Sequence, residues 1–550
     1  MDYAVNGALH YAKVILEKTN FKKIFAFGCS GNEKHNNLRP IFVDNNGYKL
    51  LNKVENFENF SKDNIEEYYR EQVLGETPQE TIELEDILKK SQELHEALRN
   101  YGQLGDSEKP LVVSAILLEL SEESFNLDSL TGDTLKTDGQ KIFDALSTHM
   151  ERVKVQPETK KDVILRQFNL IKDRTLLNQK DERLKEEVLK NNYPEKTPLK
   201  YFAEYINKNI LKSVKANTTE DVLGRFYGEF IRYSGGDGQT LGVVLTPKHI
   251  TELFCDLVDI KPTDKVFDPC CGTGGFLIAA MQKMLNNATA KEKELIKKEK
   301  IHGIETREDM FAIATTNMIL RGDGKSNLIK DNFLIRSSKD LRKNKFTVGF
   351  INPSYSQSKG KDTAHLSEIK FIEHLLDSLG NGARCVAIVP QSTMVGKTKE
   401  DKLIKEQILK KHTLEGVITL NKETFYRVGT NPCIVIFTAH KPHSEKKHCK
   451  FINFEDDGFA VSKHIGLIET ERAKERKAHL INCWLHDAPA ESKFIVKTTI
   501  EADDEWLYSF YYFNDEIPKE EDFEKTISDY LTFEFNMIAQ GKEYLFENKK

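Results

Sequence analysis

The stretch Lys265 to Leu277, KVFDPCCGTGGFL, decides the fold that this sequence predicts. A short apolar run ends in the acid Asp268, a glycine-rich turn follows, and an apolar helix opens at Phe276. Three glycines lie in the turn: Gly272, Gly274 and Gly275. Glycine tolerates positive φ angles and lets a ligand approach the main chain. Because the free amides of a helix start face this turn, we expect it to hold a nucleotide-like ligand.

The spacing of the glycines separates two classes of nucleotide. A dinucleotide fingerprint reads G-x-G-x-x-G, whereas residues 272–277 read GTGGFL and lack the third glycine. Asp268 at the strand end would repel a pyrophosphate but can pair with an amino group. The stretch therefore favours S-adenosyl-L-methionine, which carries a cationic amino acid, over NAD.

A second motif, Asn352-Pro353-Ser354-Tyr355, follows the apolar run 348–351 and is predicted to stand at the carboxyl end of another strand. Open parallel sheets bind ligands at that edge. Residues 268–276, DPCCGTGGF, resemble motif I of the amino-methylating DNA methyltransferases, and NPSY resembles their motif IV, N-P-P-[YF]. Ser354 stands where the family usually has proline, and we expect the loop to tolerate it.

This resemblance implies an α/β fold with a Rossmann-like, S-adenosylmethionine-dependent methyltransferase domain. The oxygen of the Asn352 side chain and the carbonyl of Pro353 would accept both hydrogens of a target amine. Tyr355 would stack on a base flipped out of the duplex, with Phe425 or Tyr426 as a second stacking aromatic or as a core residue. Positioning and electrostatics would carry the step without a side-chain nucleophile.

The resemblance also implies cofactor contacts outside the glycine turn. Residues 241–247, LGVVLTP, resemble motif X, although Leu245 stands where the family usually has an aromatic residue. A helix cap also explains Thr246 with Pro247. Glu305, which ends a short apolar run, is expected to accept the ribose hydroxyls. Asp331 is expected to accept a hydrogen bond from the adenine amine of the cofactor, and Asp323 and Asp340 are nearby acids that compete for this role. The remaining predicted cofactor residues are Asp268, Pro269, Gly272, Gly274, Gly275 and Phe276.

The bulk composition bounds the class of protein. The 550 residues carry a formal net charge of −6, which is not typical of a protein that wraps nucleic acid by itself. Residues 501–550 hold fourteen acidic and five basic residues. The rest of the chain is therefore slightly positive, which leaves room for a local basic face or for a partner that supplies most phosphate contacts.

Cysteine spacing and hydropathy exclude two further classes. The eight cysteines include no C-x-x-C pair, so neither a metal site nor a disulfide framework is predicted. The apolar runs are all well short of the ~18 residues of a membrane span, and Met1 does not begin a signal peptide. We therefore expect a cytoplasmic protein.

The chain divides into four predicted regions. Residues 1–60 form a small α/β segment, with a helix predicted over 3–18 and strands over 24–28 and 39–43. The segment resembles the back half of a nuclease domain, or else is an unrelated α/β cap. Because no residue precedes Met1, the nuclease centre is expected to be absent. Residues 62–236 are helical and resemble the front domain of type I modification subunits. The helices are predicted over 84–101, 107–120, 139–152, 158–174, 198–212 and 219–233. Residues 237–445 are the methyltransferase domain, in which further strands are predicted over 385–390, 416–420 and 431–437. The acidic, aromatic region 446–550 is expected to dock onto another subunit or onto the chain itself.

Together these features predict a site-specific DNA adenine-N6 methyltransferase, the modification subunit of a restriction-modification system. Its expected partners are double-stranded DNA, a separate specificity subunit and a restriction subunit. Three alternatives stay open. The same tetrad serves cytosine-N4, and a similar tetrad serves amino-methyltransferases that act on RNA or on the side-chain amide of protein glutamine. A non-catalytic scaffold of a DNA complex is the third.

Overall fold

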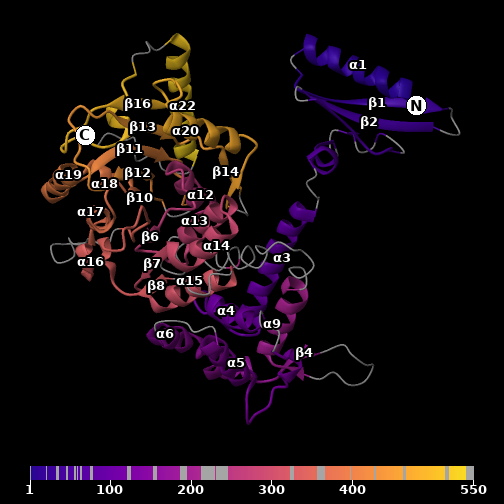
Figure 1. The fold of residues 1–550 in the computed structure, drawn as a ribbon, viewed down its shortest axis with the longest axis vertical. Helices are drawn as coiled ribbons and strands as arrows, with labels where there is room; N and C mark the ends of the chain where they lie inside the picture. Colours follow the sequence, from indigo (N-terminus) through magenta and orange to yellow (C-terminus); the bar gives the residue numbers. More distant parts are fainter. Residues whose placement is uncertain are drawn as a thin grey trace. The chain divides into compact units, whose positions relative to one another are not determined.

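The structure is a computed structural model that describes most of the chain. The described residues are 2–19, 21–31, 36–44, 47–54, 57, 60–61, 65–74, 79–120, 125–152, 158–185, 195–211, 230, 246–321, 327–355, 366–396, 398–425, 429–462, 466–514 and 519–539. They form two compact units (Figure 1). One holds Met1–Ile142 and Ile171–Ser234, and the other holds Phe143–Leu170 and Gly235–Lys550.

The first unit begins with a helix on a three-stranded antiparallel sheet. Helix α1 (Asp2–Lys18) packs on one face, where Ala12 meets Ile41 and Val43. The strands are β1 (Lys23–Gly31), β2 (Asn36–Asp44) and β3 (Gly47–Leu50), paired in that order. The other face is covered by α2 (Ile65–Tyr68) and the π-helical turn η2 (Tyr69–Leu74), through Tyr68. The helix and the two strands that the sequence predicted here are confirmed.

Helices dominate the rest of the first unit, as predicted. They are α3 (Gln79–Asn100), α4 (Lys109–Leu120), α7 (Leu170–Asp173), α8 (Thr175–Asn178), α9 (Pro198–Ile206) and the π-helical η4 (Asn207–Leu211). Helix α5 (Asp138–Arg152) begins in the first unit and belongs from Phe143 onward to the second. Helix α4 is apolar all round and buried, as expected for a central helix. A two-stranded sheet, β4 (Asp181–Lys185) with β5 (Glu195–Lys196), was not predicted. The predicted helix 219–233 lies outside the described residues apart from Phe230.

A nine-stranded mixed sheet forms the second unit. In chain order its strands are β6 (Val266–Asp268), β7 (Ile301–Glu305), β8 (Asn327–Lys330), β9 (Val348–Ile351), β10 (Arg384–Pro390), β11 (Thr413–Leu420), β12 (Pro432–Thr438), β13 (Cys449–Phe454) and β16 (Ile495–Thr498). Their order across the sheet is β16-β13-β11-β12-β10-β9-β6-β7-β8. The five strands from β8 to β10 are parallel, and β12 is antiparallel to both neighbours.

This strand order confirms the predicted Rossmann-like fold. Numbered from β6, the parallel strands run third, second, first, fourth, fifth, which is the doubly wound order. The order reverses between β6 and β9, so the chain leaves these two neighbouring strands in opposite directions across the sheet. In such sheets the crevice at the carboxyl ends of the two strands is where ligands bind.

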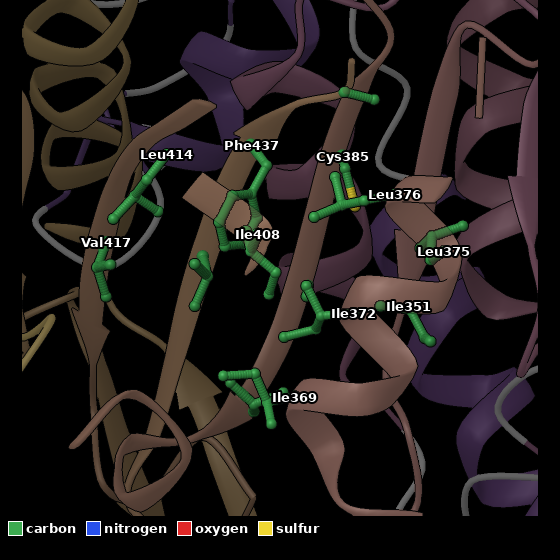
Figure 2. Packing of buried hydrophobic residues seen from close by; sticks show 14 of the residues in the cluster. Ile351, Ile369, Ile372, Leu375, Leu376, Cys385, Ile408, Leu414, Val417 and Phe437 are labelled. Atoms are coloured by element: carbon green, nitrogen blue, oxygen red, sulfur yellow. The ribbon is translucent and has the colours of Figure 1, made fainter. Parts of the chain in front are cut away.

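Helices pack against the sheet through one large apolar core. Figure 2 shows α17 (Glu368–Ser378) presenting Ile369, Ile372, Leu375 and Leu376 toward the strands. These side chains lie in one cluster with residues from β9, β10, β11, β12 and α19 (Lys399–Lys411). The strands β10 and β12 are buried almost throughout. Continuous apolar runs of this kind are expected of strands covered on both faces.

Further helices of the second unit are α6 (Glu158–Phe168), α12 (Lys248–Leu257), α13 (Gly275–Asn286), α14 (Ala290–Leu295), α15 (Glu308–Leu320), α16 (Ser338–Arg342), α18 (Gln391–Val395), α20 (Ala473–His486), α21 (Tyr508–Tyr511) and α22 (Glu520–Ala539). The hairpin β14 (Phe459–Ser462) with β15 (Gly466–Glu469) stands outside the main sheet. Trp484 of α20 donates to the Leu257 carbonyl at 2.9 Å, which ties α20 to α12. None of the described helices combines the length and apolar character of a membrane span.

The sheet continues beyond residue 445, where we predicted the methyltransferase domain to end. Strand β13 pairs parallel to β11, and β16 pairs antiparallel to β13. Trp506 is fully buried in the main core with Leu507 and Tyr508. Aromatic residues of the C-terminal region therefore complete the core, because each buries a large apolar surface that the outer strands would otherwise expose.

Candidate active site

The two sequence motifs meet at one edge of the sheet. Strands β6 and β9 pair in parallel, with Val266 beside Val348 and Phe267 beside Gly349. Asp268 is the last residue of β6, and Asn352 follows the last residue of β9. Both residues therefore leave neighbouring strands at the carboxyl edge where the strand order reverses.

The glycine turn after β6 has a fixed shape and an open side. Gly272 has φ +52° and Gly274 has φ +84°, a region that favours glycine. Gly274 precedes the first residue of α13, and its amide donates to the Cys271 carbonyl at 2.7 Å. A Cβ atom placed on Gly272 would meet no atom of the described residues within 4 Å. The turn thus leaves space beside its main chain, as a bound ligand requires.

Asp268 is a buried carboxyl group with one uncommitted oxygen. Its Oδ1 accepts a hydrogen bond of 3.0 Å from the Cys270 amide. Its Oδ2 is buried and has no hydrogen-bond partner among the described residues. Burial raises the pKa of Asp268 to about 8, and the nearby Glu305 carboxylate adds to the shift. A buried acceptor of this kind fits a cationic donor such as the ammonium group of an amino acid.

Glu305 ends β7 and holds the glycine turn from the neighbouring strand. Its Oε2 accepts from the Gly272 amide at 2.9 Å, and its Oε1 accepts from the Arg307 amide at 2.8 Å. Burial raises the pKa of Glu305, although these amide hydrogen bonds oppose the shift. Each oxygen keeps a further lone pair for a ligand hydroxyl. The position agrees with the ribose contact that the sequence predicted.

Asp331 lies directly after β8, and its amide donates to the Glu305 carbonyl at 3.0 Å. Its carboxylate accepts from the Asn332 amide at 2.7 Å and from Arg336. Burial alone would raise the pKa of Asp331, but the Arg336 and Asn332 hydrogen bonds lower it. Of its two competitors in sequence, Asp340 is exposed and paired with a lysine on α16, and Asp323 lies outside the described residues.

Thr246 does not cap a helix, contrary to the simpler reading of its sequence. Helix α12 begins at Lys248, and the residue that precedes it, Pro247, has no capping side chain. The Thr246 hydroxyl instead accepts a hydrogen bond of 2.9 Å from Nδ2 of Asn352. The Pro247 carbonyl accepts from the amides of Ile250 and Thr251. The start of α12 therefore does not need the Thr246 hydroxyl, which binds Asn352 instead. The rest of the predicted motif X, 241–245, lies outside the described residues.

The remainder of the tetrad forms a short loop with one aromatic wall. The Pro353 side chain is buried, whereas Ser354 is exposed. The Tyr355 hydroxyl donates to the Ile388 carbonyl at 3.5 Å, and burial raises its pKa well above the usual value. The Tyr355 and Phe425 rings meet edge to face with centroids 6.0 Å apart. Tyr426, the other predicted aromatic, lies outside the described residues.

The sequence predicted Phe276 as a cofactor residue, but its ring does not line the turn. The ring packs in the core against Phe254 of α12 at 4.4 Å and Phe350 of β9 at 5.8 Å, measured between centroids. An aromatic ring buries most surface where two helices and a strand converge, and this position offers that. Pro269 opens the turn between Asp268 and the cysteine pair.

The sequence predicted no catalytic or cofactor role for two further residues of this edge, Asn317 and Cys270. Asn317 of α15 is buried, and its Nδ2 donates to the Thr273 carbonyl at 3.0 Å, which braces the glycine turn. Nothing in the sequence near Asn317 signals this contact, because the two residues lie 44 positions apart. Burial raises the pKa of the Cys270 thiol well above its usual value, which disfavours the thiolate that cytosine-C5 methylation requires.

The chain has relatives of known type in sequence. The sequence profile of the N-6 DNA methylase family matches residues 218–535. The chain is 49% identical over 550 residues to the type II restriction enzyme and methyltransferase RM.BcgI of Heyndrickxia coagulans, covering 99% of this chain and 85% of that one. It is 24% identical over 262 residues to the methylase subunit of the type I restriction enzyme EcoEI of Escherichia coli, covering 44% of this chain and 51% of that subunit.

Solved structures agree on the fold. A modification subunit attributed to a type I restriction enzyme of Vibrio vulnificus YJ016 superposes with a TM-score of 0.56. The superposition covers 80% of this chain and 97% of that one at 14% sequence identity, so it bears on the fold alone. Taken with the family profile and the 49% identical relative, the chain belongs to the N-6 DNA methylases of restriction-modification systems, whose methyl donor is S-adenosyl-L-methionine.

Proposed function

We propose that this chain transfers a methyl group to the N6 amine of an adenine flipped out of double-stranded DNA, as the modification subunit of a restriction-modification system in the cytoplasm. One observation carries the proposal. The buried acid Asp268 and the amide of Asn352 leave neighbouring parallel strands at the same edge of the sheet. A methyl donor bound at Asp268 and a methyl acceptor bound at Asn352 would therefore face each other across the crevice.

The target amine is a weak nucleophile, because its lone pair is shared with the purine ring. The side-chain oxygen of Asn352 would accept a hydrogen bond from one N–H of the amine, and the Pro353 carbonyl would accept one from the other N–H. Both contacts strengthen as the amine becomes tetrahedral, which lowers the barrier through electrostatics. Tyr355 would stack on the flipped base, and the edge of Phe425 supports its ring.

The cofactor side of the site would use groups that are already oriented. S-adenosyl-L-methionine supplies an electrophilic methyl group on its sulfonium sulfur. Asp268 would bind the ammonium group through its uncommitted Oδ2, and Glu305 would accept the ribose hydroxyls. The space beside Gly272 would admit the ligand next to the main chain. Asp331 would accept a hydrogen bond from the adenine amine of the cofactor while its carboxylate also accepts one from Arg336.

Sequence choice would come from a separate specificity subunit that docks on α22. This helix exposes a row of apolar residues at four-residue spacing: Phe523, Ile527, Leu531 and Phe535. Exposed fractions of 56–70% are high for such large side chains, and a contiguous apolar row marks an interaction surface. Residues 520–534 carry six acids and one lysine. The partner surface would therefore be an amphipathic helix flanked by basic residues.

For residues 1–60 we propose membership of a nuclease-type fold. Helix α1 on the β1-β2-β3 sheet fits the part of such a fold that follows the catalytic strands. The name of the 49% identical relative, a restriction enzyme and methyltransferase, supports that origin.

Labelled methyl transfer tests the proposed function. The chain, purified from its host together with its partner, is incubated with radiolabelled S-adenosyl-L-methionine and genomic DNA of a strain from which the gene has been deleted. We expect label in DNA as N6-methyladenine. Asn352→Ala should abolish transfer, while calorimetry shows unchanged cofactor binding. Chromatography of digested DNA separates N6-methyladenine from N4-methylcytosine, the other amine that this tetrad serves.

Other outcomes would replace the proposal. Label in RNA or protein, with none in DNA, would assign the tetrad to another acceptor. A chain that binds no S-adenosyl-L-methionine would be a scaffold of a DNA complex. Loss of cofactor binding in Asn352→Ala would contradict the role given to Asn352.

A further inference from the structure

The hydroxyl of Thr246 is committed to Asn352, across 106 positions of sequence. Its Oγ1 accepts the hydrogen bond from Nδ2 at a distance of 2.9 Å, with both residues partly buried. A threonine in this position is expected to cap the following helix, yet α12 begins without a side-chain cap. The hydroxyl therefore serves the tetrad and not the helix.

An asparagine amide has two chemically opposite ends. Its oxygen accepts hydrogen bonds, whereas its NH2 group only donates them. The target amine brings two hydrogens, so it can be held by the oxygen and is repelled by the NH2 group. The two ends differ little in shape, so packing alone does not fix which one faces the crevice. In the structure the Thr246 hydroxyl accepts from the NH2 group, and in this arrangement the oxygen is the end left for the crevice.

We propose that Thr246 is a positioning residue for Asn352, which holds the amide with its oxygen turned toward the target amine. The inference rests on the proposed function, since it assumes that Asn352 accepts from that amine. It differs from the role that the sequence predicted for Thr246, which was a cofactor contact.

The position of Thr246 also joins the two halves of the site. Two residues later α12 begins, and its Phe254 packs against Phe276 at the start of α13. Thr251 of α12 lies 3.7 Å from the Cβ position of Gly275. The glycine turn that would bind the methyl donor and the Asn352 amide that would bind the target amine are therefore both connected to the start of α12. A wrongly oriented Asn352 amide would lower the rate of methyl transfer without disturbing the packing of α12 against α13.

Two substitutions at one position separate the hydroxyl from the shape of the side chain. Thr246→Val keeps the volume and removes the acceptor, and Thr246→Ser keeps the acceptor. We expect Thr246→Val to lower the single-turnover rate roughly 10- to 100-fold at saturating cofactor. Thr246→Ser should stay within about threefold of the native rate. The dissociation constants for S-adenosyl-L-methionine and for DNA should change by less than about threefold in both variants.

Thr413→Val is the matched control. The Thr413 hydroxyl donates to the Lys441 carbonyl at 2.7 Å, at the first residue of β11 and thus at the opposite end of the strands from the tetrad. We expect its rate to stay within about threefold of the native rate. Thermal unfolding of all three variants identifies any that fail to fold. If Thr246→Val does not fold, Thr246→Ala replaces it as the variant that lacks the hydroxyl acceptor.

The results distinguish this inference from the proposed function. Native turnover in Thr246→Val, together with inactive Asn352→Ala, would overturn the positioning role and leave the function standing. A weakened cofactor affinity in Thr246→Val with a normal rate at saturation would return Thr246 to the cofactor site. Full activity of Asn352→Ala would refute the proposed function first, and the inference with it.

Discussion

The Glu305 carboxylate accepts a hydrogen bond of 2.9 Å from the backbone amide of Gly272. An acid at the end of β7 thereby holds the glycine turn that follows β6, and these two strands are neighbours in the sheet. The same carboxylate also accepts from the Arg307 amide. It is therefore oriented before any ligand arrives, which reduces the entropy lost on binding.

Glu305→Gln should weaken cofactor binding and leave the methyl-transfer step intact. The substitution replaces an acceptor oxygen with an NH2 group that opposes a backbone amide, and it removes charge from the predicted ribose contact. Lost hydrogen bonds to a charged group cost about 1.5–3 kcal/mol, which predicts a roughly 10- to 100-fold higher dissociation constant for S-adenosyl-L-methionine. Titration calorimetry measures it. Asp340→Asn, an exposed acid on α16, is the control and should bind normally.

Asp268→Asn should stabilise the free protein against unfolding. The pKa of Asp268 is about 8 in the folded chain, far above its value in an unfolded chain. Above a pH of about 4 the unfolded state releases this proton and the folded state keeps it, so stability falls with rising pH up to about 8. Removing the carboxyl group should therefore raise the free energy of unfolding by on the order of 2–4 kcal/mol at pH 7.

Calorimetric unfolding of both proteins without cofactor, at several pH values from about 5 to about 8, measures this effect. The gap between variant and native melting temperatures should widen with pH. A gap that stays constant would mean that Asp268 is already ionised in the fold.

Binding of S-adenosyl-L-methionine should release a proton from Asp268 near neutral pH. Below about pH 8 the free carboxyl carries a proton, and an ammonium ligand pairs with the carboxylate form. The affinity should therefore rise with pH between about 6 and 7.5. Glu305, Cys270 and Cys271 are the other titratable groups beside it, and burial raises their pKa as well.

Calorimetry in buffers of different ionisation enthalpy counts the protons released. Asp268→Asn should remove the pH dependence along with most of the affinity. An affinity that does not vary with pH in the native protein would argue against the ammonium contact.

Ser354→Pro should restore the usual tetrad of the family without harm to folding. Ser354 is exposed, so a proline ring meets solvent on that side. Proline would restrict the loop before catalysis and recover about 0.4–1 kcal/mol of ordering entropy. We expect a single-turnover rate equal to the native rate or up to about fivefold higher. A large loss of rate would show that the Ser354 amide or hydroxyl contributes a contact of its own.

Substitution of the apolar row on α22 should release the specificity subunit. Ile527→Asp combined with Leu531→Asp places two charges in the surface that we propose to be buried in the complex. The tagged chain should then be isolated alone, with native affinity for S-adenosyl-L-methionine. Asn536→Asp, exposed on the opposite side of the helix, is the charge control. Recovery of an intact complex from the double variant would place the docking surface elsewhere.

Much of this fold was predictable, because its signals are local. The apolar run before Asp268, the glycine turn and the helix behind it form a strand-loop-helix unit in consecutive residues. The same holds for β9 and the tetrad, for the strands at β10, β11 and β12, and for the long helices of the front region. Periodicity and turn chemistry act over a few residues, so the sequence displays them directly.

The errors concern contacts between distant residues. Thr246 and Pro247 have the composition of a helix cap, yet the hydroxyl finds Asn352. Phe276 directly follows the glycines and still turns into the core, where Phe254 and Phe350 converge. The outer strands β13 and β16 are short and were not recognised as parts of the main sheet. Each of these outcomes depends on which elements pack together, which no local pattern records.

The sequence by itself determined the two corners of the site, since a strand end, a glycine turn and an N-P-x-Y tetrad each require particular residues in consecutive order. Only the tertiary structure decided that β6 and β9 are neighbours, that one Asp268 oxygen has no partner in the described part of the chain, and that Thr246 accepts a hydrogen bond from the Asn352 amide. The physical reason is that burial, pKa and side-chain orientation arise from groups brought together by folding.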